Sequence, residues 1–444
     1  MKLMILGFTV LVLLLHSDCV AQQLSKKDKS VIIDKAIRLM EENYVYPARV
    51  NTVAQQVKHR LEKGGYDSLR NMEEFLRVLN NDLERSGKDH HLNISFGPAR
   101  VKQILADEKN DKEGKDEMIT EEFLQQIRYE NFRMRKLERL DGNIGYFNFL
   151  SFTPLQVSKQ SLVAAMNFLL YSNAIIIDLR DNGGGYAQTM NFLLSYFLED
   201  SSAVSVHRFR KDNKVVKTFT VKDELINKIP RTTPVYILVS NRTSSAAEAF
   251  AFTLQQYKRA VIIGEQTKGE GNPGRLFVIN DSLYMMIPTA EGINAVSGKS
   301  IETTGVVPDI RIQRSKAMTT ALLEANRSLA KSTNIKELRS LYEWQIPFLQ
   351  NELAPASLTE DIIRNISGNY EGGRKIFREQ DALIYINSKG EKDKLTYIGN
   401  GVFQSNDRNW QRLVMPVTDK TVSYIEWTWN DGGEPQRLKR ELTK

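Results

Sequence analysis

The segment from Ala174 to Gly185 constrains the fold most, because an apolar run passes directly into three consecutive glycines. The four residues Ala174 to Ile177 predict a strand covered on both faces, which is typical of a parallel sheet. Consecutive glycines permit positive φ angles and leave amide N–H groups accessible at the end of the strand. The pattern is typical of an active-site turn that can hold an anion, and a tight turn without chemistry fits the triplet equally well. Neither a dinucleotide fingerprint nor a P-loop spacing is present.

A serine stands at a second strand-to-helix transition. Residues 234–240 predict another buried strand, and Ser245 follows it just before an apolar-rich helix that begins near Ala249. A hydroxyl at such a turn lies above the sheet, and the first N–H groups of the helix stabilise an oxyanion there. Ser245 and Glu248 also form the S-x-x-E pattern of a capping box, which needs no catalysis. For this segment alone, capping is the simpler interpretation.

Four motifs in order make the chain resemble the tail-specific (C-terminal processing) serine peptidase family. They are D-L-R-x-N-x-G-G from Asp178, T-x-S-A-A-E around Ser245, the segment 264–273 and the segment 305–310. Residues 140–146 and 89–92 resemble the branch that contains interphotoreceptor retinoid-binding protein and its bacterial relatives. The resemblance covers roughly residues 25–312 and implies an α/β fold with a ClpP/crotonase-like core.

The resemblance implies Ser245 as the nucleophile, with the N–H groups of Ala246 and of a glycine in the triplet, Gly184 first, as the oxyanion hole. In the tail-specific branch a lysine completes a Ser-Lys dyad six positions after the glycine that Gly264 matches. Here that position holds Glu270, so the dyad lysine is missing. Lys268 is two residues away, but the flanking G-E-x-T-x-G register argues against it as a substitute.

A triad replaces the dyad in relatives that lack this lysine, such as the tricorn-type core. These use a histidine from an upstream D-x-H segment and a glutamate just before G-V-x-P-D, which His91 and Glu302 match. An imidazole with a pKa of about 6.5 can take the serine proton and later deliver it to the leaving amine. A carboxylate fixes its tautomer. We therefore expect catalytic Ser245, His91 and Glu302, with His90 as the alternative base if the register shifts by one.

The amino-terminal residues predict an exported protein. Met1-Lys2, the apolar stretch from Leu3 to Leu15 and the small-residue end at Ala21 are typical of a signal peptide cleaved before Gln22. Cleavage removes Cys19, the only cysteine, so the mature chain offers no disulfide or cysteine ligand. Acylation of Cys19 would instead give a lipoprotein, which Asp18 fits poorly. We expect a periplasmic or secreted protein without a transmembrane segment.

Composition and charge narrow the partners. The formal net charge is +7, yet basic and acidic residues are interleaved and no basic-aromatic stripe is typical of a nucleic-acid module. A solvated surface is the better explanation of the charge. The few histidines form no H-E-x-x-H pattern, so we expect no metal and no cofactor. The expected partner is a protein or peptide substrate, and the oligomeric state is not indicated.

Patterns along the chain predict six parts. Helical spacing and turn-separated apolar runs mark a helical unit at the beginning and a small antiparallel β domain at the end. A charged stretch at 106–117 predicts an exposed loop or lid, and too few residues remain before Asp141 for the tail-reading PDZ module of many family members. The expected parts are a signal peptide (1–21), an N-terminal helical unit (22–95), a connector or lid (96–138), an α/β catalytic core (139–315), a helical segment (316–355) and a β domain (358–444).

Two functions follow from these features. The first is an exported serine endopeptidase that acts through an acyl-enzyme at Ser245. The second is a non-catalytic protein that binds hydrophobic small molecules on the same fold, as the retinoid-binding relative suggests. The joint presence of Ser245, His91 and Glu302 favours the enzyme, because a binding protein needs no such trio.

Overall fold

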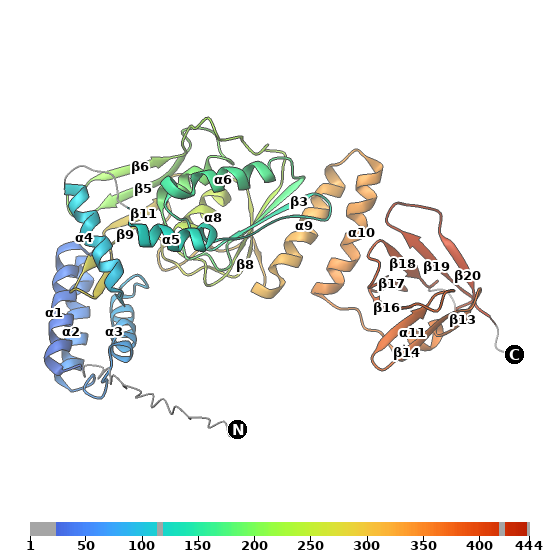
Figure 1. The fold of residues 1–444 in the computed structure, drawn as a ribbon, viewed down its shortest axis with the longest axis horizontal. Helices are drawn as coiled ribbons and strands as arrows, with labels where there is room; N and C mark the ends of the chain where they lie inside the picture. Colours follow the sequence, from blue (N-terminus) through green and yellow to red (C-terminus); the bar gives the residue numbers. More distant parts are fainter. Residues whose placement is uncertain (1–23, 113–118, 417–421, 442–444) are drawn as a thin grey trace, which may run out of the picture. The chain divides into compact units, whose positions relative to one another are not determined.

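The computed structural model describes residues 24–112, 119–416 and 422–441. The chain divides into two compact units, and Figure 1 traces its helices and strands. Unit 1 comprises Met1–Glu117 and Gly274–Thr289, and unit 2 comprises Met118–Pro273 and Ala290–Lys444. The expected signal peptide lies outside the described residues. Among those described, no helix has the length and apolar character needed to cross a membrane.

Unit 1 is built on helices, as the spacing predicts. It contains α1 (Lys26–Asn43), α2 (Pro47–Glu62), α3 (Met72–Gly87) and α4 (Pro98–Lys112). Ser25 and Asp28 cap the start of α1 reciprocally, and the Asn71 side chain accepts from the Glu74 N–H at the start of α3. The prediction of a loop at 106–117 is wrong for residues 106–112, because α4 continues to Lys112. Charged residues are compatible with an exposed helix as well as with a loop.

A small antiparallel sheet completes unit 1. Its order is β1 (Asn93–Phe96), β10 (Leu283–Pro288) and β9 (Gly274–Val278). Alternate residues of β10, namely Leu283, Met285 and Ile287, are buried in the same apolar cluster as the helices. Unit 1 therefore draws its sheet from two distant parts of the chain.

Unit 2 contains a six-stranded sheet. Its order is β12 (Ile310–Arg311), β8 (Val261–Gly264), β7 (Val235–Val239), β4 (Ala174–Asp178), β3 (Ile144–Phe149) and β2 (Met134–Leu140). All neighbours are parallel except β2, which pairs with β3 in the antiparallel direction. β4 and β7, the two strands predicted to be buried, are direct neighbours in the middle of this sheet.

Both faces of this sheet are covered, as the apolar run predicts. Ile175 and Ile177 of β4 belong to a cluster with α6 (Leu155–Leu169), α7 (Ala187–Leu194) and α8 (Ala246–Gln256). Ile176, between them, belongs to a second cluster with α9 (Ala317–Ser332) and Tyr342 of α10 (Lys336–Leu353). Alternation of side chains along a strand gives each helical layer its own set of contacts.

The remaining elements of unit 2 surround this core. Before the sheet come α5 (Glu121–Tyr129) and the short 3-10 helix η1 (Asn131–Arg133), and η2 (Arg314–Lys316) precedes α9. A three-stranded antiparallel sheet has the order β11 (Ala290–Asn294), β5 (Ala203–Phe209) and β6 (Val215–Phe219). α9 and α10 lie side by side (Figure 1). These two helices span most of the helical segment expected at 316–355.

The end of the chain forms an antiparallel β domain after the short helix α11 (Glu360–Ile366). Its eight strands pair in sequence order: β13 (Gly368–Tyr370), β14 (Arg374–Glu379), β15 (Ala382–Ile386), β16 (Lys392–Tyr397), β17 (Val402–Ser405), β18 (Gln411–Val414), β19 (Tyr424–Trp429) and β20 (Gln436–Lys439). A bridge between Tyr370 and Arg440 joins the first strand to the end of the last. The sheet therefore nearly closes on itself, around an interior that contains Phe403 and Trp427. The α/β class, the helical unit and the β domain are confirmed.

Candidate active site

The ends of β4 and β7 position the site. Asp178 is the last residue of β4, and its carboxylate receives bonds from Arg180 Nε at 2.9 Å and from the Tyr146 hydroxyl at 2.7 Å. Asp178 and Arg180 also form an ion pair. The Thr243 hydroxyl, beyond β7, donates to the Leu179 carbonyl at 2.7 Å. The two loops are therefore tied together where their strands end.

The glycine turn packs directly on the serine turn. A Cβ built on Gly184 would lie 2.7 Å from Ser245 Cβ and 3.0 Å from the Ala246 nitrogen. Gly184 has φ +92°, which also favours glycine. The Asn182 side chain holds this turn, because its Oδ1 accepts from the Gly184 N–H at 2.9 Å. The close backbone approach expected for the triplet is therefore present, and its partner is Ser245.

Ser245 has a strained backbone at the start of α8. Its φ of +54° and ψ of −125° are uncommon for a residue with a side chain. The residue is half-buried, and Ala246 after it is the first residue of the helix. The N–H groups of the first helical turn have no partner within the helix and lie at the positive end of its dipole.

Glu248 does more than cap the helix. One carboxylate oxygen accepts from the Ser245 N–H at 2.9 Å, as a capping box requires, and from the Glu270 N–H at 2.8 Å. The other accepts from the Thr267 hydroxyl and from the Gly269 N–H at 2.7 Å. Glu248 is fully buried. Burial raises its pKa above the ordinary value, although these four hydrogen bonds act in the opposite direction.

The loop at 264–272 contains Glu270, at the position that matches the lysine of the Ser-Lys dyad. Glu270 at that position is buried, and its carboxylate pairs with Lys268 Nζ. The ammonium of Lys268 is therefore engaged by Glu270, and its side chain is 44% exposed. This arrangement gives no support to Lys268 as a replacement base.

Glu302 is held beside the same loop. One of its carboxylate oxygens accepts from the Gly271 N–H at 2.9 Å and from the Asn272 N–H at 2.8 Å. The Thr303 N–H donates to the Gly269 carbonyl at 2.9 Å. Unit 2 thus contains Ser245, Ala246, Gly184 and Glu302.

His91 belongs to unit 1, where a buried aspartate holds it. Asp89 Oδ1 accepts from the His91 N–H at 2.9 Å and lies 3.2 Å from His91 Nδ1. The Tyr44 hydroxyl donates to Asp89 Oδ2 at 2.8 Å. Burial alone raises the pKa of Asp89, but the hydrogen bonds and charge of His91 outweigh it, so the pKa lies below its usual value.

Sequence analysis assigned no catalytic role to Asp89, although the D-x-H spacing contains the signal. An aspartate can bond the backbone N–H two residues later and thereby hold the side chain of that residue close. His90, the alternative base, is exposed and lies 2.5 Å from Glu84 Oε1 through its Nδ1. The buried carboxylate therefore contacts His91 and not His90.

Comparisons with known proteins identify the family of the chain. Residues 143–312 match Peptidase family S41, and residues 23–134 match the N-terminal domain of Peptidase_S41 in eukaryotic IRBP. The chain belongs to peptidase family S41, which confirms the resemblance drawn from the four motifs.

Relatives in this family carry names of processing peptidases. The chain is 30% identical over 184 residues to carboxyl-terminal-processing peptidase 1, chloroplastic, of Arabidopsis thaliana, covering 41% of this chain and 36% of that protein. It is 28% identical over 180 residues to the carboxy-terminal-processing protease of Bartonella bacilliformis, covering 40% of each. A putative peptidase from Parabacteroides merdae has a TM-score of 0.43 and 18% identity over 64% of this chain and 90% of its own. The chain spans well under two thirds of the length of the curated relatives it matches.

Proposed function

We propose that this chain is an exported serine endopeptidase that hydrolyses protein substrates through an acyl-enzyme at Ser245. The strained Ser245 turn carries the proposal, because Ser245 begins a helix and packs against the backbone of Gly184. Such backbone strain costs about 1–3 kcal/mol and persists where the surrounding structure enforces it, often at active sites. Membership of family S41 and the names of the relatives support a protein substrate.

The proposed reaction uses three side chains. Ser245 Oγ attacks the carbonyl carbon of the scissile peptide while His91 takes its proton, and Glu302 stabilises the imidazolium that forms. The C–N bond then breaks as His91 gives the proton to the leaving amine. His91 then takes a proton from water, which attacks the carbonyl carbon of the resulting ester. The bond to Ser245 Oγ breaks as His91 returns the proton to that oxygen. Each step conserves the proton that the imidazole carries.

The proposed oxyanion hole uses the N–H groups of Ala246 and Gly184. The first belongs to the opening turn of α8, where N–H groups stabilise negative charge. The second donates to Asn182 Oδ1 in the structure. To act in the oxyanion hole, the Gly184 N–H must therefore leave Asn182 Oδ1, or share its hydrogen bond, when the carbonyl oxygen of the scissile peptide becomes negative.

Asp89 is a second candidate for orienting the base. It lies against His91 Nδ1 within unit 1, whereas Glu302 belongs to unit 2. A carboxylate on Nδ1 fixes the tautomer in which Nε2 is the proton acceptor. We keep Glu302 in the triad from the family pattern and assign Asp89 to positioning the ring. The variants Asp89→Asn and Glu302→Gln separate the positioning of the ring from the stabilisation of the imidazolium.

Hydrolysis of a labelled protein tests the proposal. The chain beginning at Gln22 should cleave fluorescently labelled casein, and Ser245→Ala should abolish cleavage while keeping the melting temperature. If the wild type binds a retinoid or fatty acid, Ser245→Ala should bind it equally well. Casein left intact by the folded chain, together with saturable binding of a retinoid or fatty acid, would favour the hydrophobic-ligand alternative.

Export is tested separately. The full chain, expressed in a bacterium with two membranes, should be recovered from the periplasm or the medium with Gln22 as its first residue. Recovery of an acylated protein that begins at Cys19 would show a lipoprotein instead. Cytoplasmic recovery with Met1 retained would contradict export.

A further inference from the structure

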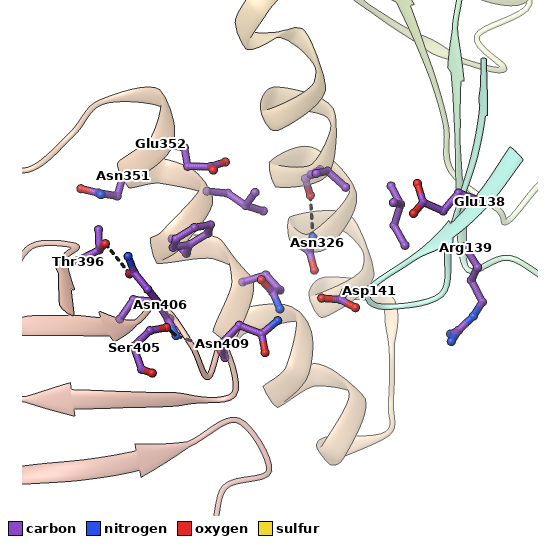
Figure 2. A pocket seen from close by; sticks show the side chains of 16 residues that line it. Glu138, Arg139, Asp141, Asn326, Asn351, Glu352, Thr396, Ser405, Asn406 and Asn409 are labelled. Carbon is purple, nitrogen blue, oxygen red and sulfur yellow. Dashed lines mark hydrogen bonds between the residues drawn. The ribbon is translucent and has the colours of Figure 1, made fainter. Parts of the chain in front are cut away.

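A polar cavity lies within unit 2, apart from the Ser245 turn. Its volume is about 800 Å³, within the range of small-molecule sites. Figure 2 shows that its side chains come from the end of β2 and the turn after it, from α9 and α10, and from the β domain. No residue assigned above to catalysis lines it.

The walls of this cavity are fastened to one another. Trp344 of α10 donates from Nε1 to the Asn409 carbonyl at 2.9 Å, and the Arg412 guanidinium lies 4.0 Å from the centre of its ring. On the other side, the Asn173 amide donates to the Tyr342 hydroxyl of α10 at 2.7 Å. α10 is therefore tied both to the β domain and to the core, which favours a preformed cavity.

Hydrogen bonds fix the direction of several amides in the lining. Thr396 donates to Asn406 Oδ1 at 2.7 Å, and the Ala356 N–H donates to Asn351 Oδ1 at 2.8 Å. Both amides thus keep their NH₂ groups available as donors. The cavity therefore offers two oriented donors from different walls.

Asn326 of α9 supplies the opposite chemistry. It is 3% exposed, and its Nδ2 donates to the Leu322 carbonyl at 2.8 Å (Figure 2). Its Oδ1 has no hydrogen-bond partner among the described residues. A buried acceptor left without a partner costs about 1–3 kcal/mol, which a donor on a bound ligand would offset.

The charges and apolar contacts of the lining select the ligand further. Glu138 pairs with Lys136, and Arg139 and Asp141 have opposite charges, which leaves the carboxylate of Glu352. The lining therefore disfavours strongly anionic ligands such as phosphates. Phe348 adds an apolar face. A saccharide matches this combination, because its hydroxyl groups both donate and accept while its C–H faces pack on apolar side chains.

We propose that this cavity binds a neutral saccharide, with Asn326 as an acceptor and Asn351 and Asn406 as donors. Gln345 of α10 also lines the cavity and makes no hydrogen bond through its side chain among the described residues. It serves as a contact that can be removed without disturbing the walls. The proposal is independent of the peptidase activity.

Calorimetric titration of the chain from Gln22 tests the site with two probes, maltotriose and N,N′,N″-triacetylchitotriose. We expect at least one to bind, and Gln345→Ala to weaken it about three- to tenfold, as loss of one hydrogen bond of about 1 kcal/mol implies. Gln350→Ala, on the same helix and outside the lining, should bind as the wild type does.

Two further variants keep the test decisive. Asn326→Leu should weaken binding more than Gln345→Ala does, and Asn409→Ala replaces it if the leucine variant fails to fold. Gln345→Ala and Gln350→Ala should both keep the labelling of Ser245 by a fluorophosphonate that the wild type shows. Absence of binding of either trisaccharide at about 10 mM, well above the range of a specific millimolar complex, would overturn the proposal, as would equal binding by Gln345→Ala and Gln350→Ala.

Discussion

The turn that carries Ser245 and the segment that carries His91 hold their reactive side chains in different ways. Ser245 is fixed through its backbone, by a φ of +54°, by the Glu248 carboxylate on its N–H and by the packing of Gly184. His91 is fixed through its ring and its N–H, both of which contact Asp89. Main-chain geometry therefore determines the position of Ser245, whereas a contact with a buried carboxylate determines the position of His91.

This difference teaches that the two halves respond to different substitutions. The Ser245 turn is sensitive to an atom added at Gly184, because that atom would meet the backbone of Ser244 and Ala246, which cannot move aside as a flexible side chain does. The His91 segment is sensitive to the charge of one carboxylate. Because each set of contacts lies within its own compact unit, each half can be altered separately.

The largest effect should come from removing the imidazole. We expect His91→Ala to lower kcat/KM for peptide hydrolysis by about 10²–10⁴-fold, the usual contribution of a general acid–base group. His90→Ala is the matched control, since it removes an exposed ring that pairs with Glu84. Stopped-time assays on a fluorogenic peptide measure both. Loss of activity in His90→Ala alone would show that the base is the other histidine.

Gly184→Ala should displace the turn that carries Ser245. Its new Cβ would meet Ser245 Cβ at 2.7 Å and the Ser244 carbonyl at 2.9 Å, so we expect about 10²-fold slower acylation through a displaced oxyanion hole. Gly298→Ala is the control, because Gly298 also has a positive φ but has no atom within 4 Å of the added Cβ. Equal acylation rates in the two variants would show that the glycine contact does not position Ser245.

Asp89→Asn and Glu302→Gln test which carboxylate orients and stabilises His91. We expect either replacement to lower kcat by on the order of tenfold or more, because the imidazolium loses a carboxylate that stabilises it. Asp89→Asn should also shift the histidine resonances of unit 1 in the free protein, since Asp89 Oδ1 lies 3.2 Å from His91 Nδ1. A kcat unchanged in Glu302→Gln would remove Glu302 from the triad and leave Asp89 as the orienting residue.

Glu248→Gln should lower stability with a smaller effect on rate. An amide nitrogen would face two of the four donors that the carboxylate now accepts, at a cost of about 1–3 kcal/mol for each lost bond. We expect a lower urea midpoint and a modest fall in kcat. A midpoint equal to that of the wild type would show that these donors find water instead.

The two buried carboxylates should respond oppositely to pH. The depressed pKa of Asp89 adds stability above its unfolded pKa of about 3.9, and this stability is lost as the pH falls through the folded value. The raised pKa of Glu248 has the reverse sign, so its contribution falls as the pH rises from about 4.3 through the folded value. Urea midpoints between pH 3 and 8 should therefore rise less steeply in Asp89→Asn than in the wild type, and more steeply in Glu248→Gln. Parallel curves for all three proteins would contradict both assignments.

Local patterns in the sequence were sufficient for much of the fold. The apolar run before Gly183 predicted a strand covered on both faces, and β4 has a separate helical layer on each side. The turn residues after Leu358 predicted the β domain, whose strands pair with their sequence neighbours. These features depend on residues close together in the chain, which is why their pattern is visible.

Features that join distant segments were not predictable in this way. β9 and β10 belong to unit 1 although they follow most of the α/β core in sequence. Glu248 was recognised as a capping residue, but its bonds to Thr267, Gly269 and Glu270 depend on a loop that comes from elsewhere in the fold. Asp89 was visible as part of D-x-H, but its burial against Tyr44 was not. Helix and strand periodicities report which face is buried and not what covers it.

The most direct test of the proposed triad is labelling of the folded chain by a fluorophosphonate, which forms a covalent bond only with an activated serine. The wild type and Lys268→Ala should be labelled at Ser245, whereas Ser245→Ala and His91→Ala should not. Labelling that persists in His91→Ala and disappears in Lys268→Ala would contradict the triad and assign the base to the lysine.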